Sequence, residues 1–144
     1  MKIKSSKNFS GPRFPEKASI KKHHVSRLAF NFSFLTQEKD YSLKSRKISK
    51  DVKLKLLERI SSLSEEDKVL IMNRPKEQGL EPLPEEVVNL HINSDFKKSG
   101  RYDECDEYYW VFRLSKKGRV IGKINENIFY ILAIDPKFKL YKHG

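Results

Sequence analysis

Two apolar segments joined by a short basic turn constrain the fold of this chain more than any other feature. Tyr109–Leu114 and Arg119–Ile124 are both rich in aromatic and aliphatic residues, and Trp110, Phe112 and Leu114 recur at every second position, as expected of strands. Lys116-Lys117-Gly118 lies between them, and a three-residue loop that ends in glycine is typical of a β-hairpin. The two segments therefore predict an antiparallel hairpin in which Arg113 pairs with Ile121.

This register sorts the side chains of the hairpin between the two faces of the sheet. The apolar face, which is suited to pack on helices, consists of Trp110, Phe112, Leu114, Val120 and Ile124. The opposite face carries Arg113, Arg119 and Lys123, at the spacing of about 5–8 Å that cross-strand neighbours have. Because these cations repel one another and arginine matches phosphate oxygens with a planar fork, they predict a phosphate-binding surface. A solvated polar face that binds nothing is the alternative interpretation.

The other segments predict an α+β fold. The chain begins with an expected strand at 27–34, followed by a helix capped by Ser49 whose apolar face carries Val52, Leu56, Ile60 and Leu63. A shorter helix capped by Ser64 comes next, with Val69, Leu70 and Met72 in apolar contact. We then expect a proline-containing loop at 73–84, a strand at 88–92, an acidic loop at 95–107, the hairpin, and a last strand at 128–134. This order of strand, two helices and four strands predicts a mainly antiparallel sheet of about five strands with the helices packed on one face.

The charge of the chain favours a polyanionic partner. Its 144 residues include 30 Lys and Arg against 19 Asp and Glu, a formal net charge of +11, and a domain with a pI above about 9 is typical of nucleic-acid binders. An acidic membrane or protein partner is the alternative. Residues 1–24 form a basic arm that contains Lys21 and Lys22, and we expect it to be a flexible tether along phosphates ahead of a single domain at 25–144. A leader without a binding role explains the arm equally well.

The sequence also argues against several kinds of site. Cys105 is the one cysteine, so a disulfide framework is excluded and a reducing compartment is expected. No apolar run reaches the roughly 18 residues of a membrane span, which predicts a cytoplasmic protein without a membrane partner. His23 and His24 are adjacent in the arm, and no zinc-ligand spacing, calcium loop or phosphate-binding glycine loop is present. We therefore expect neither a metal nor a cofactor.

The last third of the chain resembles a known superfamily. Trp110-Val111-Phe112-Arg113-Leu114, Arg119-Val120-Ile121-Gly122 and Ile128–Asp135, followed by Lys137 and Tyr141, are similar to the carboxy-terminal half of the RelE/ParE toxin superfamily. The same residues and the ending Lys142-His143-Gly144 also resemble a poorly characterised family of small bacterial proteins that share an FRL…R-IG…FY-L-D…Y-HG pattern. The resemblance covers residues 108–144 by motif and residues 27–92 only by the order of elements.

The resemblance implies a RelE-like fold and a toxin-like, metal-independent endoribonuclease. Such enzymes cut messenger RNA on the ribosome through attack of the RNA's own 2′-hydroxyl on the adjacent phosphate. Arg113 and Arg119 would then stabilise the phosphorane, Lys137 would stand in place of a last-strand arginine, and Tyr141 would transfer a proton, with His143 as a further candidate for proton transfer. Lysine at position 137 lacks the bidentate fork, and Pro136 interrupts the end of its strand, so both depart from the superfamily pattern.

The remaining expectations concern partners. The expected nucleic-acid contacts are Lys116, Lys117, Lys123 and Lys139, with Lys21 and Lys22 in the arm, and RNA is favoured over DNA. The ribosome and an inhibitory antitoxin are further expected partners of a toxin. Some relatives of this fold inhibit gyrase and cut no RNA, so a fold does not determine an activity. The alternative function is a non-catalytic basic protein of a phage or mobile element that binds nucleic acid or a nucleoprotein.

Overall fold

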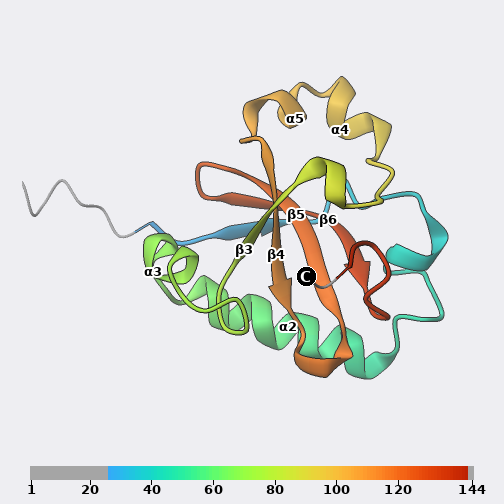
Figure 1. The fold of residues 1–144 in the computed structure, drawn as a ribbon, viewed down its shortest axis with the longest axis horizontal. Helices are drawn as coiled ribbons and strands as arrows, with labels where there is room; N and C mark the ends of the chain where they lie inside the picture. The colour runs from blue at the N-terminus through green and yellow to red at the C-terminus, as the bar shows by residue number, and fades with distance from the viewer. Residues whose placement is uncertain (1–25, 143–144) are drawn as a thin grey trace, which may run out of the picture.

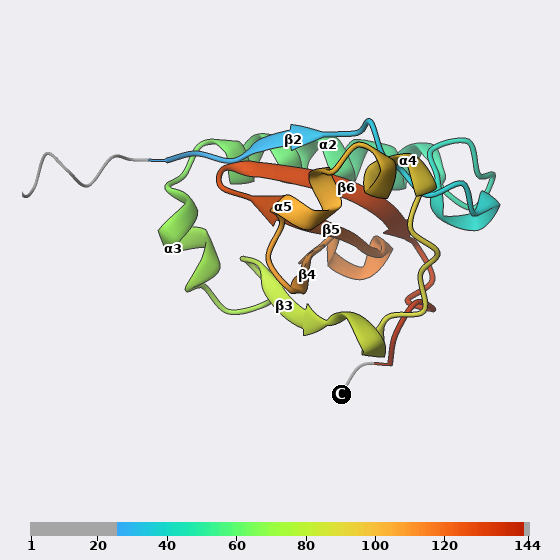
Figure 2. The same ribbon diagram turned by 90° about the horizontal axis from the view of Figure 1, so that it is seen from above.

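A five-stranded mixed sheet forms the centre of the protein (Figure 1). The computed structural model describes residues 26–142. The strands are β2 (Ala29–Asn31), β3 (Glu81–Pro84), β4 (Tyr108–Arg113), β5 (Arg119–Asn125) and β6 (Ile128–Asp135), in the order β2-β6-β5-β4-β3. β2 pairs parallel with β6, whereas the other neighbours pair antiparallel. Figure 2 shows β2 and β3 at the two edges of the twisted sheet. The α+β class is therefore confirmed.

The longest helix follows its sequence signals closely. α2 (Lys50–Ser64) begins where the Ser49 hydroxyl accepts a hydrogen bond of 3.3 Å from the amide of Val52, as expected of a helix N-cap. Val52, Leu56 and Leu63 are buried on the predicted face. This face packs on the sheet because its apolar side chains recur every three or four residues.

The second helix begins later than the sequence predicts. Ser64 is still the last residue of α2, and α3 (Lys68–Met72) is capped by Asp67, whose carboxylate accepts from the amide of Val69. Ile71 is the side chain that α3 buries fully, while Val69 and Leu70 are more than half exposed. Both Ser64 and Asp67 are residue types that cap helices, so the sequence alone did not distinguish them.

The helices cover both faces of the sheet, not one face as predicted. α2 and α3 lie on the face that carries Phe112, Val120 and Phe129. Two short helices, α4 (Ser94–Lys98) and α5 (Arg101–Glu104), pack with Phe96 and Tyr102 on the opposite face. The sequence indicated an acidic loop at 95–107, because neither helix is long enough to show an apolar period. The face predicted to be open and cationic is therefore a second hydrophobic core.

The β4–β5 hairpin has the predicted faces but a different register. Arg113 pairs with Arg119 and not with Ile121, and the amide of Leu114 donates to the carbonyl of Gly118 over 2.8 Å. The loop is longer than predicted because the short 3-10 helix η3 (Ser115–Lys117) fills it. A shift of two residues leaves every side chain on its own side of the sheet, which is why the sorting of apolar and cationic residues was correct.

A β-bulge in β6 explains why adjacent residues of this strand share a face. The pairing with β5 shifts between Ile121, which faces Ala133, and Gly122, which faces Ile131. Leu132 is the extra residue, and it joins Ala133 in the core of the second face. An added residue bends a strand and re-aims the side chains beyond it, so Asp135 comes to lie opposite Arg119.

One strand lies in a different place from the prediction. The fifth strand is β3, within the expected loop at 73–84, and not the segment 88–92. β3 contains Pro82 and Pro84, and an edge strand tolerates proline because the missing amide would face away from the sheet. The amide of Asn89 donates instead to the carbonyl of Leu140 over 2.7 Å. No helix in residues 26–142 has both the length and the apolar character of a membrane span.

Candidate functional site

Arg119, the central residue of the predicted phosphate site, is fully buried in a polar cluster. Its Nε donates to Asp135 Oδ2 over 2.9 Å and its Nη2 donates to the carbonyl of Tyr141 over 2.7 Å. The guanidinium also lies over the Tyr141 ring, 3.4 Å from its centroid. Arginine is the residue best suited to such a pair because its rigid fork serves two acceptors at once. In this conformation Arg119 is closed off from solvent by its own chain.

Asp135 also anchors the segment that follows β6. Its carboxylate accepts hydrogen bonds of 2.9 Å from the amides of Lys139 and Leu140, and it also pairs with Arg119. Residues 136–142 are thereby folded back on the second face of the sheet, where Leu140 and Tyr141 are buried. Asp135 was visible in the sequence motif, but no local signal identified it as the partner of Arg119.

The structure brings together part of the predicted catalytic set. Arg113 lies opposite Arg119 on neighbouring strands, and Tyr141 stacks on Arg119, so these three residues share one face. Burial raises the pKa of Tyr141 above its ordinary value, although the Arg119 cation opposes this shift. A phenol with a raised pKa is a weaker source of protons at neutral pH. Lys137 is exposed two residues after the end of β6, and His143 lies outside the described residues.

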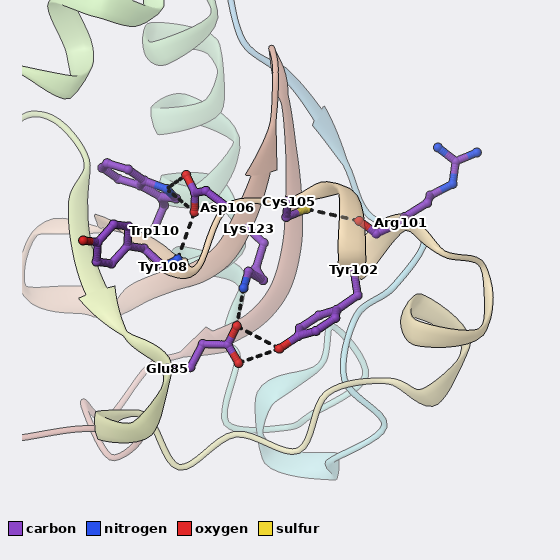
Figure 3. Close-up of polar contacts among 8 residues, drawn as sticks. All are labelled: Glu85, Arg101, Tyr102, Cys105, Asp106, Tyr108, Trp110 and Lys123. Atoms are coloured by element: carbon purple, nitrogen blue, oxygen red, sulfur yellow. Dashed lines mark hydrogen bonds and ion pairs between the residues drawn. The ribbon is translucent and has the colours of Figure 1, made fainter.

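Lys123, a predicted nucleic-acid contact, is buried in a second ion pair (Figure 3). Its ammonium donates to the carboxylate of Glu85 and lies 4.7 Å from the Tyr102 ring centroid. Tyr102 also donates its hydroxyl proton to Glu85, over 2.7 Å. Burial raises the pKa of Glu85, but the hydrogen bonds from Lys123 and Tyr102 outweigh it and hold this pKa below its ordinary value. The prediction of an open cationic face is therefore wrong for both Lys123 and Arg119.

Lys123 and Glu85 are part of the lining of an acidic hollow. This hollow has a volume of about 420 Å³ and is lined by Glu85, Glu86, Tyr102, Asp103, Cys105, Asp106, Glu107 and Lys123. Asp106 is held in place by the indole of Trp110, which donates to it over 3.0 Å. Within residues 26–142, no group of three or more His, Cys, Asp or Glu side chains is arranged to hold a metal ion. The carboxylates would repel phosphate, so the acidic hollow itself is unsuited to bind it.

Cys105 in the acidic hollow is expected to react slowly with thiol reagents. Burial raises its pKa from 9.0 to about 11, against the opposing effect of Lys123, and the thiolate is the reactive form. At pH 8 we expect alkylation by iodoacetamide about 100-fold more slowly than for a thiol of ordinary pKa, since each pKa unit is tenfold in thiolate. The rate should keep rising up to about pH 11. A rate that levels off near pH 9, as in the urea-unfolded protein, would contradict this environment.

Exposed cations gather at the opposite end of the sheet from α5. We call this surface the basic end and define it by Lys39, Lys44, Arg46, Lys47, Lys50, Lys116, Lys117, Lys137, Lys139 and Lys142, all of which are exposed. They come from the loop that holds η1 (Lys39–Tyr41), the start of α2, η3 and the segment after β6. In Figure 1 the η1 loop and the segment after β6 lie to the right at mid-height, and the start of α2 and η3 lie along the lower edge. Asp40 and Asp51 are their carboxylate neighbours, 3.0 Å from Lys47 and 3.9 Å from Lys117.

The basic end contains the predicted contacts that remain accessible. Lys116 and Lys117 are exposed in η3, and Lys137 and Lys139 are exposed after β6. Lys137 and Lys139 line one small cavity together with Lys47 from the other side. Lys21 and Lys22 lie outside the described residues. The cations at 39–50 were missed because the sequence indicated only a lysine-rich loop, without showing that the fold places it beside residues 137–142.

Comparisons with known proteins place the chain in no family. No protein-family model, curated protein or solved structure matches it. The similarity to the RelE/ParE superfamily therefore stays a prediction from the motif. Support for a function comes from the side chains and surfaces of the chain itself, and above all from the exposed lysines of the basic end.

Proposed function

We propose that the protein binds nucleic acid, with RNA favoured, through the phosphates that contact its basic end. The observation that carries this proposal is the concentration of exposed lysines on one end of the sheet, while the buried cations within residues 26–142, Arg119 and Lys123, are already paired. Exposed lysine and arginine side chains supply the phosphate contacts and the counterion release that dominate nucleic-acid affinity. This function is the non-catalytic alternative derived from the sequence.

The distribution of charge supports an oriented contact. The acidic hollow lies beside α5, and η3, which belongs to the basic end, lies at the other end of β4 (Figure 1). A polyanion is attracted to one end of this molecule and repelled from the other, and such a field steers association. The two carboxylates within the basic end, Asp40 and Asp51, are outnumbered by the surrounding lysines. The net charge of +11 adds a general attraction.

Three lysine substitutions test the proposal. In the basic-end variant, Lys116→Ala/Lys137→Ala/Lys139→Ala, we expect the affinity for a fluorescein-labelled 12-nucleotide RNA to fall at least about tenfold at 0.1 M salt. These side chains are exposed, and the amide of Lys139 that binds Asp135 is retained, so the fold should persist. Fluorescence anisotropy measures the affinity.

A matched variant controls for net charge. The control variant, Lys76→Ala/Lys97→Ala/Lys98→Ala, removes the same charge from exposed positions outside the basic end. We expect it to bind the RNA within about twofold of the wild type, because contacts to phosphate are local. Equal losses in the two variants would show that overall charge, not the basic end, determines binding.

The RelE-like fold and ribosome-dependent endoribonuclease implied by the motif stay predictions. Their support is the proximity of Arg113, Arg119 and Tyr141 on one face. Against them, Arg119 and Tyr141 are buried, so residues 136–142 would have to move before a phosphate reached Arg119. Cell-free translation with the messenger RNA ends mapped by primer extension tests this activity: new ends at codon boundaries support it, and an intact message excludes it.

A further inference from the structure

A hollow with both apolar and cationic walls adjoins the basic end. It has a volume of about 590 Å³ and is lined by Val87, Asn89, Phe138, Lys139, Leu140, Tyr141 and Lys142. Small-molecule sites in proteins have volumes of about 300–1,000 Å³, so the hollow is large enough for one nucleotide. Lys139 and Lys142 belong to both the hollow and the basic end, which makes the two surfaces continuous.

Phe138 is the unusual residue of this hollow. Its backbone has a φ of 57°, in the left-handed region where bulky residues are rare. Asp135 maintains this conformation, because its carboxylate accepts hydrogen bonds from the amides of the two residues that follow Phe138, Lys139 and Leu140. The ring lies 5.4 Å from the buried Arg119 guanidinium and is partly exposed. Strained residues that their surroundings hold in place are concentrated at ligand sites.

The two kinds of wall point to one class of ligand. Phosphate alone would contact Lys139 and Lys142 but would not use the half-exposed Val87 or the partly exposed face of the Phe138 ring. A flat aromatic group that carries a phosphate suits both walls, and Asn89 adds an exposed amide that can donate to and accept from a base edge. A nucleobase that is not paired in a duplex has these properties.

We propose that this hollow, the base hollow, holds one unpaired nucleobase of the nucleic acid whose phosphates lie on the basic end. This inference rests on the proposed function and deepens it, because it makes single-stranded nucleic acid the substrate class. The base contacts Phe138 and Val87, and its flanking phosphates contact Lys139 and Lys142. A fully paired duplex keeps its bases stacked inside, so it uses the lysines alone.

The test separates bases from phosphates by changing the ligand. One probe is a fluorescein-labelled single-stranded RNA of 12 nucleotides, and the other is an abasic ribose-phosphate strand with the same number of phosphates. Stacking of one base on an aromatic side chain corresponds to roughly a tenfold change in affinity. We expect the wild type to bind the RNA about tenfold more tightly than the abasic strand, as measured by fluorescence anisotropy.

Variants of the base hollow should lose this preference and nothing else. Phe138→Leu keeps an apolar side chain but removes the aromatic face, so the RNA should bind no more tightly than the abasic strand, whose own affinity should stay within about twofold. Val87→Ser lies on an exposed wall, where truncation leaves the core intact, and should lower the preference at least about threefold. The second variant gives a result even if Phe138→Leu fails to fold.

The possible outcomes distinguish the base hollow from the basic end. Equal affinity of the wild type for RNA and abasic strand would overturn the base hollow, while leaving the phosphate contacts of the basic end in place. Retention of the preference in both variants would also overturn it, since the bases would then bind elsewhere. Failure to bind either strand, in contrast, would overturn the proposed function itself.

Discussion

Arg119→Ala is expected to lower the free energy of unfolding by about 3–5 kcal/mol, the usual consequence of removing one member of a buried ion pair. Arg119 and Asp135 are both fully buried and 2.9 Å apart, so the substitution leaves the buried Asp135 carboxylate without its cationic partner. It also removes the bond to the Tyr141 carbonyl. Urea unfolding followed by the fluorescence of Trp110 measures the change.

Lys137→Ala is the matched control for this result. Lys137 is a cation only two residues beyond Asp135, but its side chain is exposed, and we expect a change below about 0.5 kcal/mol. Arg119→Lys should fall between the two, because it retains the charge but not the planar fork. If Arg119→Ala were as stable as Lys137→Ala, Arg119 would not be the structural residue that the buried cluster indicates.

Glu85→Ala is expected to have the next largest effect, a loss of about 2–3 kcal/mol. The substitution leaves the ammonium of Lys123, 1% exposed, without its carboxylate, and an unpaired buried charge is costly. The side chain of Glu85 is 31% exposed, so water reaches the gap and the loss should be smaller than for Arg119→Ala. Thermal or urea unfolding at pH 7 measures it.

A second substitution and a pH series test the cause of this loss. Glu85→Ala/Lys123→Met should recover most of the stability, because an apolar side chain replaces the unpaired charge. The pKa of Glu85 is lowered in the folded state from an ordinary value of 4.5, so the unfolded chain takes up this proton first as the pH falls. The stabilisation by Glu85 is therefore present above pH 4.5 and is lost below it. No recovery in the double variant would contradict the ion-pair explanation.

The sequence was most informative where periodic apolar residues coincide with a local signal. α2 has both a capping serine and a repeating apolar face, and the faces of β4 and β5 followed from alternation alone. The predicted hairpin register was wrong by two residues. The predicted three-residue loop and the observed five-residue loop, which contains a helical turn, place the same side chains on the same faces, so the apolar pattern could not distinguish them. β3 was missed because its prolines indicate a loop unless the strand is known to be at an edge.

The candidate site was predicted less well, because its partners are distant in the sequence. Arg113, Arg119 and Lys123 were correctly placed on one face, but the sequence could not show that this face is covered by α4, α5 and residues 136–142. Asp135 reaches Arg119 only after a bulge re-aims the end of β6. Glu85 is 38 positions from Lys123, and only the tertiary fold brings them together. Lys116, Lys117 and Lys139, in contrast, were identified without knowledge of a partner, whereas the exposed cations at 39–50 were missed.

The salt dependence of RNA binding tests the role of the basic end most directly. The logarithm of the association constant for a single strand falls with the logarithm of the salt concentration, by about 0.7 for each phosphate contacted. If three lysines of the basic end each contact a phosphate, the slope of the basic-end variant should be less steep than that of the wild type by about 2, whereas the slope of the control variant should be unchanged. Identical slopes for the wild type and the basic-end variant would contradict phosphate binding at the basic end.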